Sequence, residues 1–178
     1  MQARTAYVHG GFTMIEVLVA LFVLAVGVVG ASAAQLAAQR TRQYAALSSE
    51  AALLAASLAA RMQANAPVAG LPEGANPYLA FDYDALADAP PAGGSSCFGA
   101  GACDPSALAA FDLHETRLAL QRSFPAGRIA VCRDAAPWDE ALGRYRWECG
   151  GEAGAPVAIK VGWHGTGDEP GYVLLVAR

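Results

Sequence analysis

The chain has 178 residues, a length that accommodates one domain with a long appendage and leaves no room for two full hydrophobic cores. Its formal net charge at pH 7 is -4, with 12 basic against 16 acidic side chains, and this balance argues against a surface that binds the phosphates of nucleic acid. Apolar residues make up 54% of the sequence, and a dense block of them lies near the N-terminus.

That block contains eighteen consecutive uncharged residues, 17–34. A helix of this length crosses a hydrocarbon layer of ~30 Å at ~1.5 Å per residue. Its residues are apolar on every side, which is rare in a buried helix of a soluble protein. Three interpretations remain open: a cleaved secretory signal ending near residues 31–35, an ordinary membrane anchor, and a segment that passes from the bilayer into a protein assembly. The acidic Glu16 at the entry and the single basic Arg4 before it argue against the signal.

The residues that lead into the apolar run read GGFTMIE and end at Glu16. This pattern resembles the prepilin cleavage and methylation motif of type IV pilins and type II secretion pseudopilins. The resemblance implies that a prepilin peptidase cleaves after Gly11, removes residues 1–11 as a leader, and methylates the new amine of Phe12. It also implies that Glu16, the fifth residue of the processed chain, is required for assembly.

The carboxylate of Glu16 has a physical reason to need that processing. A charged side chain near the middle of a membrane helix costs ~3 kcal/mol, and less near an end, so Glu16 needs a partner. Cleavage turns the nitrogen of Phe12 into a cation one helical turn away, on the same chain or on a neighbouring subunit. We expect Glu16 to set the axial register between subunits by pairing with a Phe12 amine. The alternative is that Glu16 only caps its own helix.

Residues 35–66 predict that the helix continues beyond the transmembrane half formed by residues 12–34. They contain no Gly or Pro and are rich in helix-forming Ala, Leu, Gln and Arg. Aliphatic side chains recur near helical spacing on one face: Leu47, Ala51, Leu54, Leu58 and Met62. We expect this face to pack against a globular head, while Arg61 and other charged side chains point outward. The helix ends at Ala66 because a residue before a proline, here Pro67, disfavours helical geometry.

The head, residues 67–178, opens with a predicted loop over residues 68–101 that is rich in Pro, Gly and Ser. Three aspartates in it could suggest a calcium loop: Asp82, Asp84 and Asp88. Their spacing lacks the glycine turn and the terminal glutamate of the helix-loop-helix site. We therefore expect a solvated acidic loop, no metal site and no cofactor.

Four cysteines lie in the head at positions 97, 103, 132 and 149. A head that follows a membrane helix lies in the oxidising periplasm, where an even number of cysteines favours two disulfides. Zinc sites prefer tighter Cys-x-x-Cys or Cys/His pairs, and none is present. The sequence permits three pairings. We favour Cys97 with Cys103, closing a loop of small residues, and Cys132 with Cys149, joining neighbouring strands.

A second helix is predicted over residues 105–122, because Asp104 is a good N-cap and Pro105 suits the first helical position. Its apolar face is expected to contain Leu108, Phe111 and Leu118.

Alternating apolar residues then predict strands over residues 129–132, 145–149, 157–163 and 172–176, with a hairpin connection at 165–171. The expected fold is α+β and pilin-like. A long N-terminal helix, with a membrane half and an amphipathic half, packs against a roughly four-stranded antiparallel sheet, with an extra helix and a disulfide-bridged loop.

The head narrows the resemblance to one type of subunit. Residues 55–65, 112–113, 124–128 and 131–132 look like those of a minor pilin of the PilV type, although His114 stands where such sequences often have an aromatic residue. The resemblance implies a structural subunit that joins other minor pilins in a priming complex, starts pilus polymerisation and stays near the tip.

The partners that this resemblance implies are the other minor pilins, the major pilin, the prepilin peptidase and, as a further candidate, a tip adhesin; nucleic acid is not among them. The implied location is the inner membrane with a periplasmic head, and after assembly the pilus at the cell surface.

No catalytic constellation emerges, so an enzyme is not expected. The histidines are far apart in the sequence, at His9, His114 and His164, and no nucleophile elbow or phosphate-binding glycine motif is present. The three tryptophans are interpreted as core or interface residues. Two other functions remain open: a minor pseudopilin of type II secretion, and a tip ligand-binding module that uses Trp163 and residues 71–102 as contacts.

Overall fold

The structure is a computed structural model that describes residues 11–94, 97–98, 103–152 and 154–176. The predicted leader therefore lies outside the described residues, apart from Gly11. The elements in chain order are α1 (Met14–Ala64), α2 (Ala66–Ala69), the 3-10 helix η1 (Glu73–Ala75), β1 (Asp82–Asp84), α3 (Pro105–Ser123), β2 (Arg128–Arg133), β3 (Trp138–Asp139), β4 (Arg144–Tyr145), β5 (Val157–Gly162) and β6 (Tyr172–Val176).

The chain divides into two compact units, Met1–Tyr44 and Ala45–Arg178, and α1 contributes to both. The described residues of the first unit form the N-terminal part of α1. Every described residue up to Ala46 is exposed. The helix begins and ends within two residues of the predicted bounds. Gly27 and Gly30 do not interrupt it.

In the second unit, residues 45–64 of α1 contribute one face to the core. The buried residues of this helix are Ala51, Ala55, Leu58, Ala59 and Met62, and they include three of the five positions predicted. The other two, Leu47 and Leu54, are partly buried against the same cluster.

Arg61 points outward only in part: its side chain is 40% exposed, but it has a partner inside the head. Its Nη1 lies 3.0 Å from Oδ1 of Asp112, whose side chain is 5% exposed. The reason is that α3 places a carboxylate inside the head, and a buried charge requires a paired partner.

The predicted end of the long helix is correct within two residues, and its proline has a second role. α1 ends at Ala64, and α2 starts at Ala66 with Pro67 in its first turn. A proline is tolerated there because the N–H groups of a first turn lack helical partners in any case. Pro67 thus follows the end of α1 and lies in the first turn of α2.

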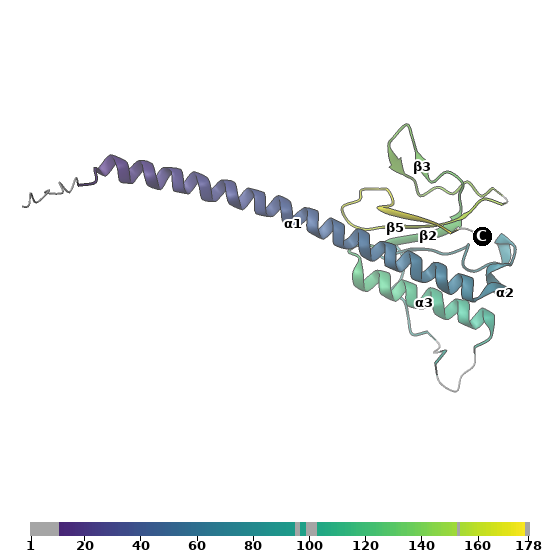
Figure 1. The fold of residues 1–178 in the computed structure, drawn as a ribbon. Coiled ribbons are helices and arrows are strands. Elements are labelled where there is room, and N and C mark those ends of the chain that lie inside the picture. The colour runs from purple at the N-terminus through teal and green to yellow at the C-terminus, as the bar shows by residue number, and fades with distance from the viewer. Residues whose placement is uncertain (1–10, 95–96, 99–102, 153, 177–178) are drawn as a thin grey trace, which may run out of the picture. The chain divides into compact units, whose positions relative to one another are not determined.

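The sheet has the order β1-β2-β5-β6, and each neighbouring pair is antiparallel. Figure 1 shows α3 and residues 45–64 of α1 on one side of this sheet and the β3–β4 hairpin on the other. The α+β architecture is therefore as predicted: a long N-terminal helix on a four-stranded antiparallel sheet, an extra helix and a disulfide in a loop.

One predicted strand is wrong, and one strand of the sheet was not predicted. The fourth strand of the sheet is β1, which lies inside the segment predicted as loop, and the predicted strand over residues 145–149 is not part of the sheet. Arg144–Tyr145 pairs instead with Trp138–Asp139 in a separate two-stranded hairpin. The backbone carbonyls that follow accept hydrogen bonds from a lysine rather than from another strand.

Helix α3 has the predicted N-terminus, since Asp104 Oδ1 accepts a hydrogen bond from Ala107 N at 2.8 Å. Its predicted apolar face is wrong. The buried positions are Ala109, Asp112, Leu113, Thr116 and Leu120, whereas Leu108, Phe111 and Leu118 are only partly buried. The prediction followed the large apolar side chains and ignored Asp112, which the partners on α1 and the following loop draw inside.

The two faces of the sheet differ in side-chain size. Large aliphatic residues face the helices and join the core: Ile129, Val131, Ile159 and Val161. Alternation puts smaller residues and one lysine on the other face: Ala130, Cys132, Ala158, Lys160 and Gly162. The small side chains leave room there for the segment that carries Trp147 and Cys149. A Cβ on Gly162 would lie 2.8 Å from Cζ2 of Trp147, so a larger residue there would force the indole ring to shift.

Candidate functional site

The N-terminal motif forms the first turn of α1. Glu16 Oε2 accepts hydrogen bonds from Thr13 N at 2.9 Å and from Thr13 Oγ1 at 3.0 Å, and Thr13 Oγ1 accepts one from Glu16 N at 3.3 Å. This reciprocal arrangement is a capping box, which satisfies N–H groups that no helical carbonyl can reach. Glu16 therefore caps its own helix in the uncleaved chain. Phe12 has a peptide N–H there rather than an amine, so the pairing of Glu16 with that amine stays a prediction.

The proposed cleavage point is accessible. Gly11 is exposed, and the side chain of Phe12 is 88% exposed. Neither residue belongs to α1, which starts at Met14. A peptidase can therefore reach the bond between them without unwinding the helix.

The apolar half of α1 suits a membrane. Its most apolar 18-residue window has a mean hydropathy of 2.6, and none of that window is buried. By length and composition this segment is able to cross a bilayer. In the first unit the chain provides no cover for these side chains among the described residues, so lipid or another protein must provide it.

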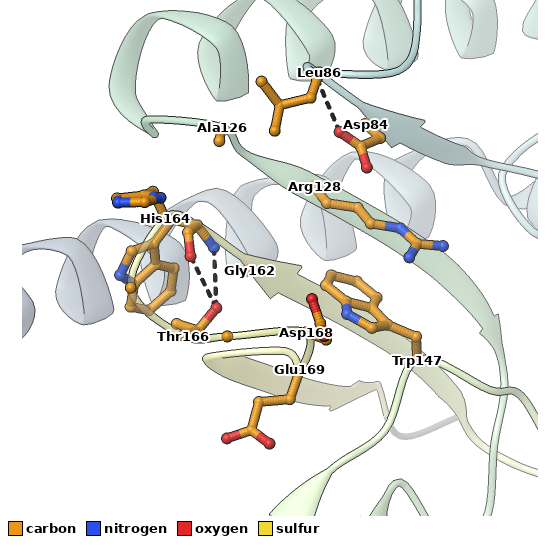
Figure 2. Close-up of a pocket in the computed structure, with 13 residues that line it drawn as sticks. Asp84, Leu86, Ala126, Arg128, Trp147, Gly162, His164, Thr166, Asp168 and Glu169 are labelled. Atoms are coloured by element: carbon orange, nitrogen blue, oxygen red, sulfur yellow. Dashed lines mark hydrogen bonds between the residues drawn. The ribbon is translucent and has the colours of Figure 1, made fainter.

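The head has a hollow of about 560 Å³ beside the β5–β6 turn (Figure 2). Arg128 crosses it, with Nε and Nη2 bonded to the carboxylate of Asp82 at 3.3 and 3.0 Å. The hydrogen bond to Asp82 is the main reason why the pKa of Arg128 is raised above its ordinary value. The guanidinium carbon lies 4.4 Å from the ring centroid of Trp147, a cation-π contact.

This hollow does not contain a nucleophile and base arranged for catalysis. The hydroxyl of Thr166 donates to Trp163 O at 2.9 Å and so stabilises the turn. His164 is exposed, and Figure 2 shows it at the rim opposite Trp147. Within the described ranges, no group of three or more His, Cys, Asp or Glu side chains is arranged to hold a metal ion. Of the three aspartates in the predicted acidic loop, Asp82 pairs with Arg128, and Asp88 accepts a hydrogen bond from Asp84 N at 2.7 Å.

The second face of the sheet contains a buried cation that the sequence interpretation missed. Lys160 is fully buried, and its Nζ lies 2.6 Å from Oδ2 of Asp134, which is 1% exposed. The same ammonium donates to the carbonyl oxygens of residues 146, 147 and 148, at 2.8, 3.4 and 2.7 Å. We call this arrangement the Lys160 clamp. The signal for it was in the sequence, because the chain's sole lysine stands between Ala158 and Gly162 in an apolar strand, where a cation needs a partner.

All four predicted cysteines form disulfides. Cys97 is bonded to Cys103 in the loop before α3, and Cys132 of β2 is bonded to Cys149. The second bridge crosses from the sheet to the segment that the Lys160 clamp also fixes. It therefore joins β2 to a covering segment rather than to a neighbouring strand.

The tryptophans have three different environments. Trp163 is 3% exposed and packs on Phe124, with ring centroids 5.9 Å apart. The interpretation as a core residue is therefore confirmed for Trp163, and the alternative in which it contacts a ligand loses its support. Trp147 is partly buried against Gly162, whereas Trp138 is 47% exposed on β3.

The comparisons with known proteins bear on the N-terminus. A family model described as the prokaryotic N-terminal methylation motif matches residues 8–32. No curated protein matches the chain, and no solved structure does. The matched segment contains the predicted cleavage point, Glu16 and most of the apolar run, and it leaves the head unmatched. Together with the capped, fully exposed apolar helix, the match supports a type IV pilin-like protein, either a pilin or a pseudopilin.

Proposed function

We propose that this chain is a minor pilin of the PilV type, a structural subunit rather than an enzyme. A prepilin peptidase removes residues 1–11 and methylates Phe12. Residues 12–34 hold the subunit in the inner membrane, residues 35–66 continue the helix into the periplasm, and residues 67–178 form the head. The subunit then joins other minor pilins in a complex that primes the pilus and stays near its tip.

One observation carries this proposal: the methylation motif at residues 8–32 leads directly into a helix whose apolar surface is entirely exposed. Such a surface is stable only in lipid or against other subunits. A subunit that uses both environments in turn needs a signal that releases it from the membrane, and cleavage at Gly11 provides a new charged terminus next to Glu16. The ligand-binding alternative loses support, since its proposed Trp163 contact is buried.

The processed terminus gives the first test. Mass spectrometry of the protein from membranes is expected to find a chain that starts at methylated Phe12. A chain that starts near Ala34, or one that keeps residues 1–11 while it polymerises, would refute the proposal.

The second test concerns assembly. Glu16→Gln is expected to leave cleavage intact and to lower the amount of the protein in sheared filaments by about tenfold, the equivalent of ~1.4 kcal/mol. Glu50→Gln, at an exposed position of the same helix, is the matched control and is expected to assemble normally.

Deletion of the gene separates a type IV pilus subunit from a type II secretion subunit. Loss of pili and twitching supports the minor pilin, and loss of protein secretion with pili intact supports a type II pseudopilin.

A further inference from the structure

The β3–β4 hairpin lies on the side of the sheet away from the helices (Figure 1), and it carries two exposed apolar side chains. Leu142 is 61% exposed at its turn, and Trp138 is 47% exposed on β3. Trp138 packs edge-on against Tyr145 across the hairpin, with ring centroids 5.0 Å apart. An isolated two-stranded hairpin is marginally stable in water, so this one depends on how the rest of the head holds it.

Both ends of the hairpin segment, residues 134–149, are fixed to the sheet. The Lys160 clamp binds the carboxylate of Asp134 at one end and three carbonyl oxygens at the other. The disulfide between Cys132 and Cys149 closes the same segment covalently. A buried ion pair and a covalent bond therefore both restrict this one segment.

The turn between the two strands is also ordered. Asp139 Oδ1 accepts hydrogen bonds from Ala141 N at 2.9 Å and Leu142 N at 3.0 Å. Gly143, at φ 63°, closes the turn by donating its N–H to Asp139 O at 2.8 Å. Arg146 donates from Nε and Nη2 to Ala136 O and so joins the two arms. Leu142 thus has a fixed backbone and an exposed side chain, and such preorganisation lowers the entropy that binding costs.

A hollow of about 350 Å³ lies between the hairpin and the β5–β6 turn. Four carboxylates line it, from Asp139, Glu148, Asp168 and Glu169, against the two guanidinium groups of Arg144 and Arg146. The acidic side chains exceed the basic ones by two, and Arg144 pairs with Glu169 at 3.4 Å while Arg146 is hydrogen-bonded to the carbonyl of Ala136. The hollow therefore presents a negative potential next to an exposed leucine, which is complementary to a cation beside an apolar group.

We propose that the hairpin segment is the surface by which the head docks on a neighbouring protein of the assembly. The occupant is a segment of another protein that carries a Lys or Arg next to an apolar side chain, with the cation in the acidic hollow and the apolar group on Leu142 and Trp138. A second copy is disfavoured because its net charge is also -4. This inference rests on the proposed function, which supplies the neighbouring subunit.

Photocrosslinking in the full-length protein tests the inference in cells that assemble it. Leu142→benzoylphenylalanine is expected to give one dominant adduct, on a segment of another protein with a Lys or Arg within a few residues of the crosslink. Leu86→benzoylphenylalanine, at a position that is 80% exposed but outside the hairpin segment, is the matched control. The Leu142 adduct should exceed the Leu86 adduct by about tenfold or more, the ratio that ~1.4 kcal/mol of preference produces.

A charge reversal tests the acidic hollow. Glu148→Lys with Asp168→Lys is expected to lower the Leu142 adduct about tenfold, whereas Glu73→Lys with Glu115→Lys, the same change of net charge elsewhere on the head, leaves it unchanged. An equal adduct from Leu86, an adduct to a second copy, an adduct to an acidic segment, or no effect of the reversal overturns the inference.

The proposed function is tested separately in the same cells, by detecting the protein in sheared filaments. Filaments that contain the protein without a Leu142 adduct overturn the hairpin inference alone. Absence of the processed protein from filaments overturns the proposed function.

Discussion

Lys160 stabilises the head only because its buried ammonium is paired with an anion and hydrogen-bonded to carbonyl oxygens. A buried ammonium loses its hydration, and the Asp134 carboxylate with three carbonyl oxygens replaces that hydration. Removing the cation leaves a buried anion and three part-buried carbonyl acceptors without their donor, and the unpaired buried anion costs the most free energy. A single substitution should therefore be far more damaging than the removal of both charges together.

We expect Lys160→Met to lower the free energy of unfolding by ~3–5 kcal/mol, because it leaves Asp134 buried and unpaired. Urea denaturation of the detergent-solubilised protein, followed by tryptophan fluorescence, measures the change. Arg144→Met removes an exposed ion pair and is expected to change stability by no more than ~1 kcal/mol. The double variant Lys160→Met/Asp134→Leu should recover part of the loss, and equal losses in the single and double variants would contradict this account.

Tyr78 makes the stability of the head sensitive to alkaline pH. Burial, together with the neighbouring Asp112 carboxylate, raises the pKa of Tyr78 to about 12, although the hydrogen bond from Asn65 acts in the opposite direction. The folded state therefore keeps the phenolic proton at a pH where the unfolded chain releases it. The stabilising effect is complete below the ordinary pKa of about 10 and disappears as the pH rises to about 12.

Tyr78→Phe is expected to remove this alkaline loss and to lower stability at neutral pH by ~1–3 kcal/mol, because the carboxylate of Asp112 loses a donor. Tyr83→Phe is the matched control, since the buried hydroxyl of Tyr83 has no hydrogen-bond partner among the described residues. Urea midpoints at several values between pH 8 and 12 compare the two variants. A parent protein with equal stability at both ends of that range would contradict the prediction.

At the level of elements, the disulfide of β2 and the Lys160 clamp both hold the β3–β4 hairpin. The bridge joins Cys132 to Cys149 across 17 residues. Closing a loop of about this length stabilises a fold by ~3 kcal/mol in the chain-entropy description. The two constraints act on the same residues, so their effects are expected to be coupled.

Cys132→Ala/Cys149→Ala is expected to raise the amide hydrogen-exchange rates of residues 138–145 and to leave those of α3 unchanged, because the local opening of the hairpin becomes easier. Cys97→Ala/Cys103→Ala removes the other bridge and should have no effect on residues 138–145. Mass-spectrometric hydrogen exchange resolves these peptides. Unchanged protection of the hairpin after loss of Cys132–Cys149 would show that the clamp alone suffices.

In the whole molecule, the two units differ in what makes them stable. The core begins at Ala51 on α1 and continues through the head, whereas no described residue before Leu47 is even partly buried. The second unit thus contains all of the apolar packing that the described residues show, and the first depends on its surroundings.

A fragment of residues 45–178 is therefore expected to be soluble, folded and monomeric at micromolar concentration without detergent. Its unfolding free energy should lie within ~1 kcal/mol of that of the full chain, because no buried contact is lost. Circular dichroism, light scattering and urea denaturation check this. A fragment that aggregates or unfolds would contradict the division into two units.

The sequence predicted the elements with strong local signals. The bounds of α1 followed from an uninterrupted helical composition, and the start of α3 from Asp104 and Pro105. The strand β1 was missed because three residues give too short an alternation to recognise. The buried face of α3 depends on Asp112, and the place of residues 145–149 depends on Lys160. The partners of both side chains lie far away in the sequence, so no local pattern could predict either arrangement. The expected processing site follows from local residues alone, and the family match over residues 8–32 covers the segment in which it lies.

The burial of the chain's sole lysine has a practical chemical consequence. Reagents that acylate amines, such as succinimide esters of fluorophores or biotin, cannot reach its Nζ while the head is folded. Under native conditions they should modify a single position, the nitrogen at the start of the polypeptide. Stoichiometric tagging there, followed by peptide mapping, would report directly on where the mature protein starts and on whether that nitrogen is still free inside a filament.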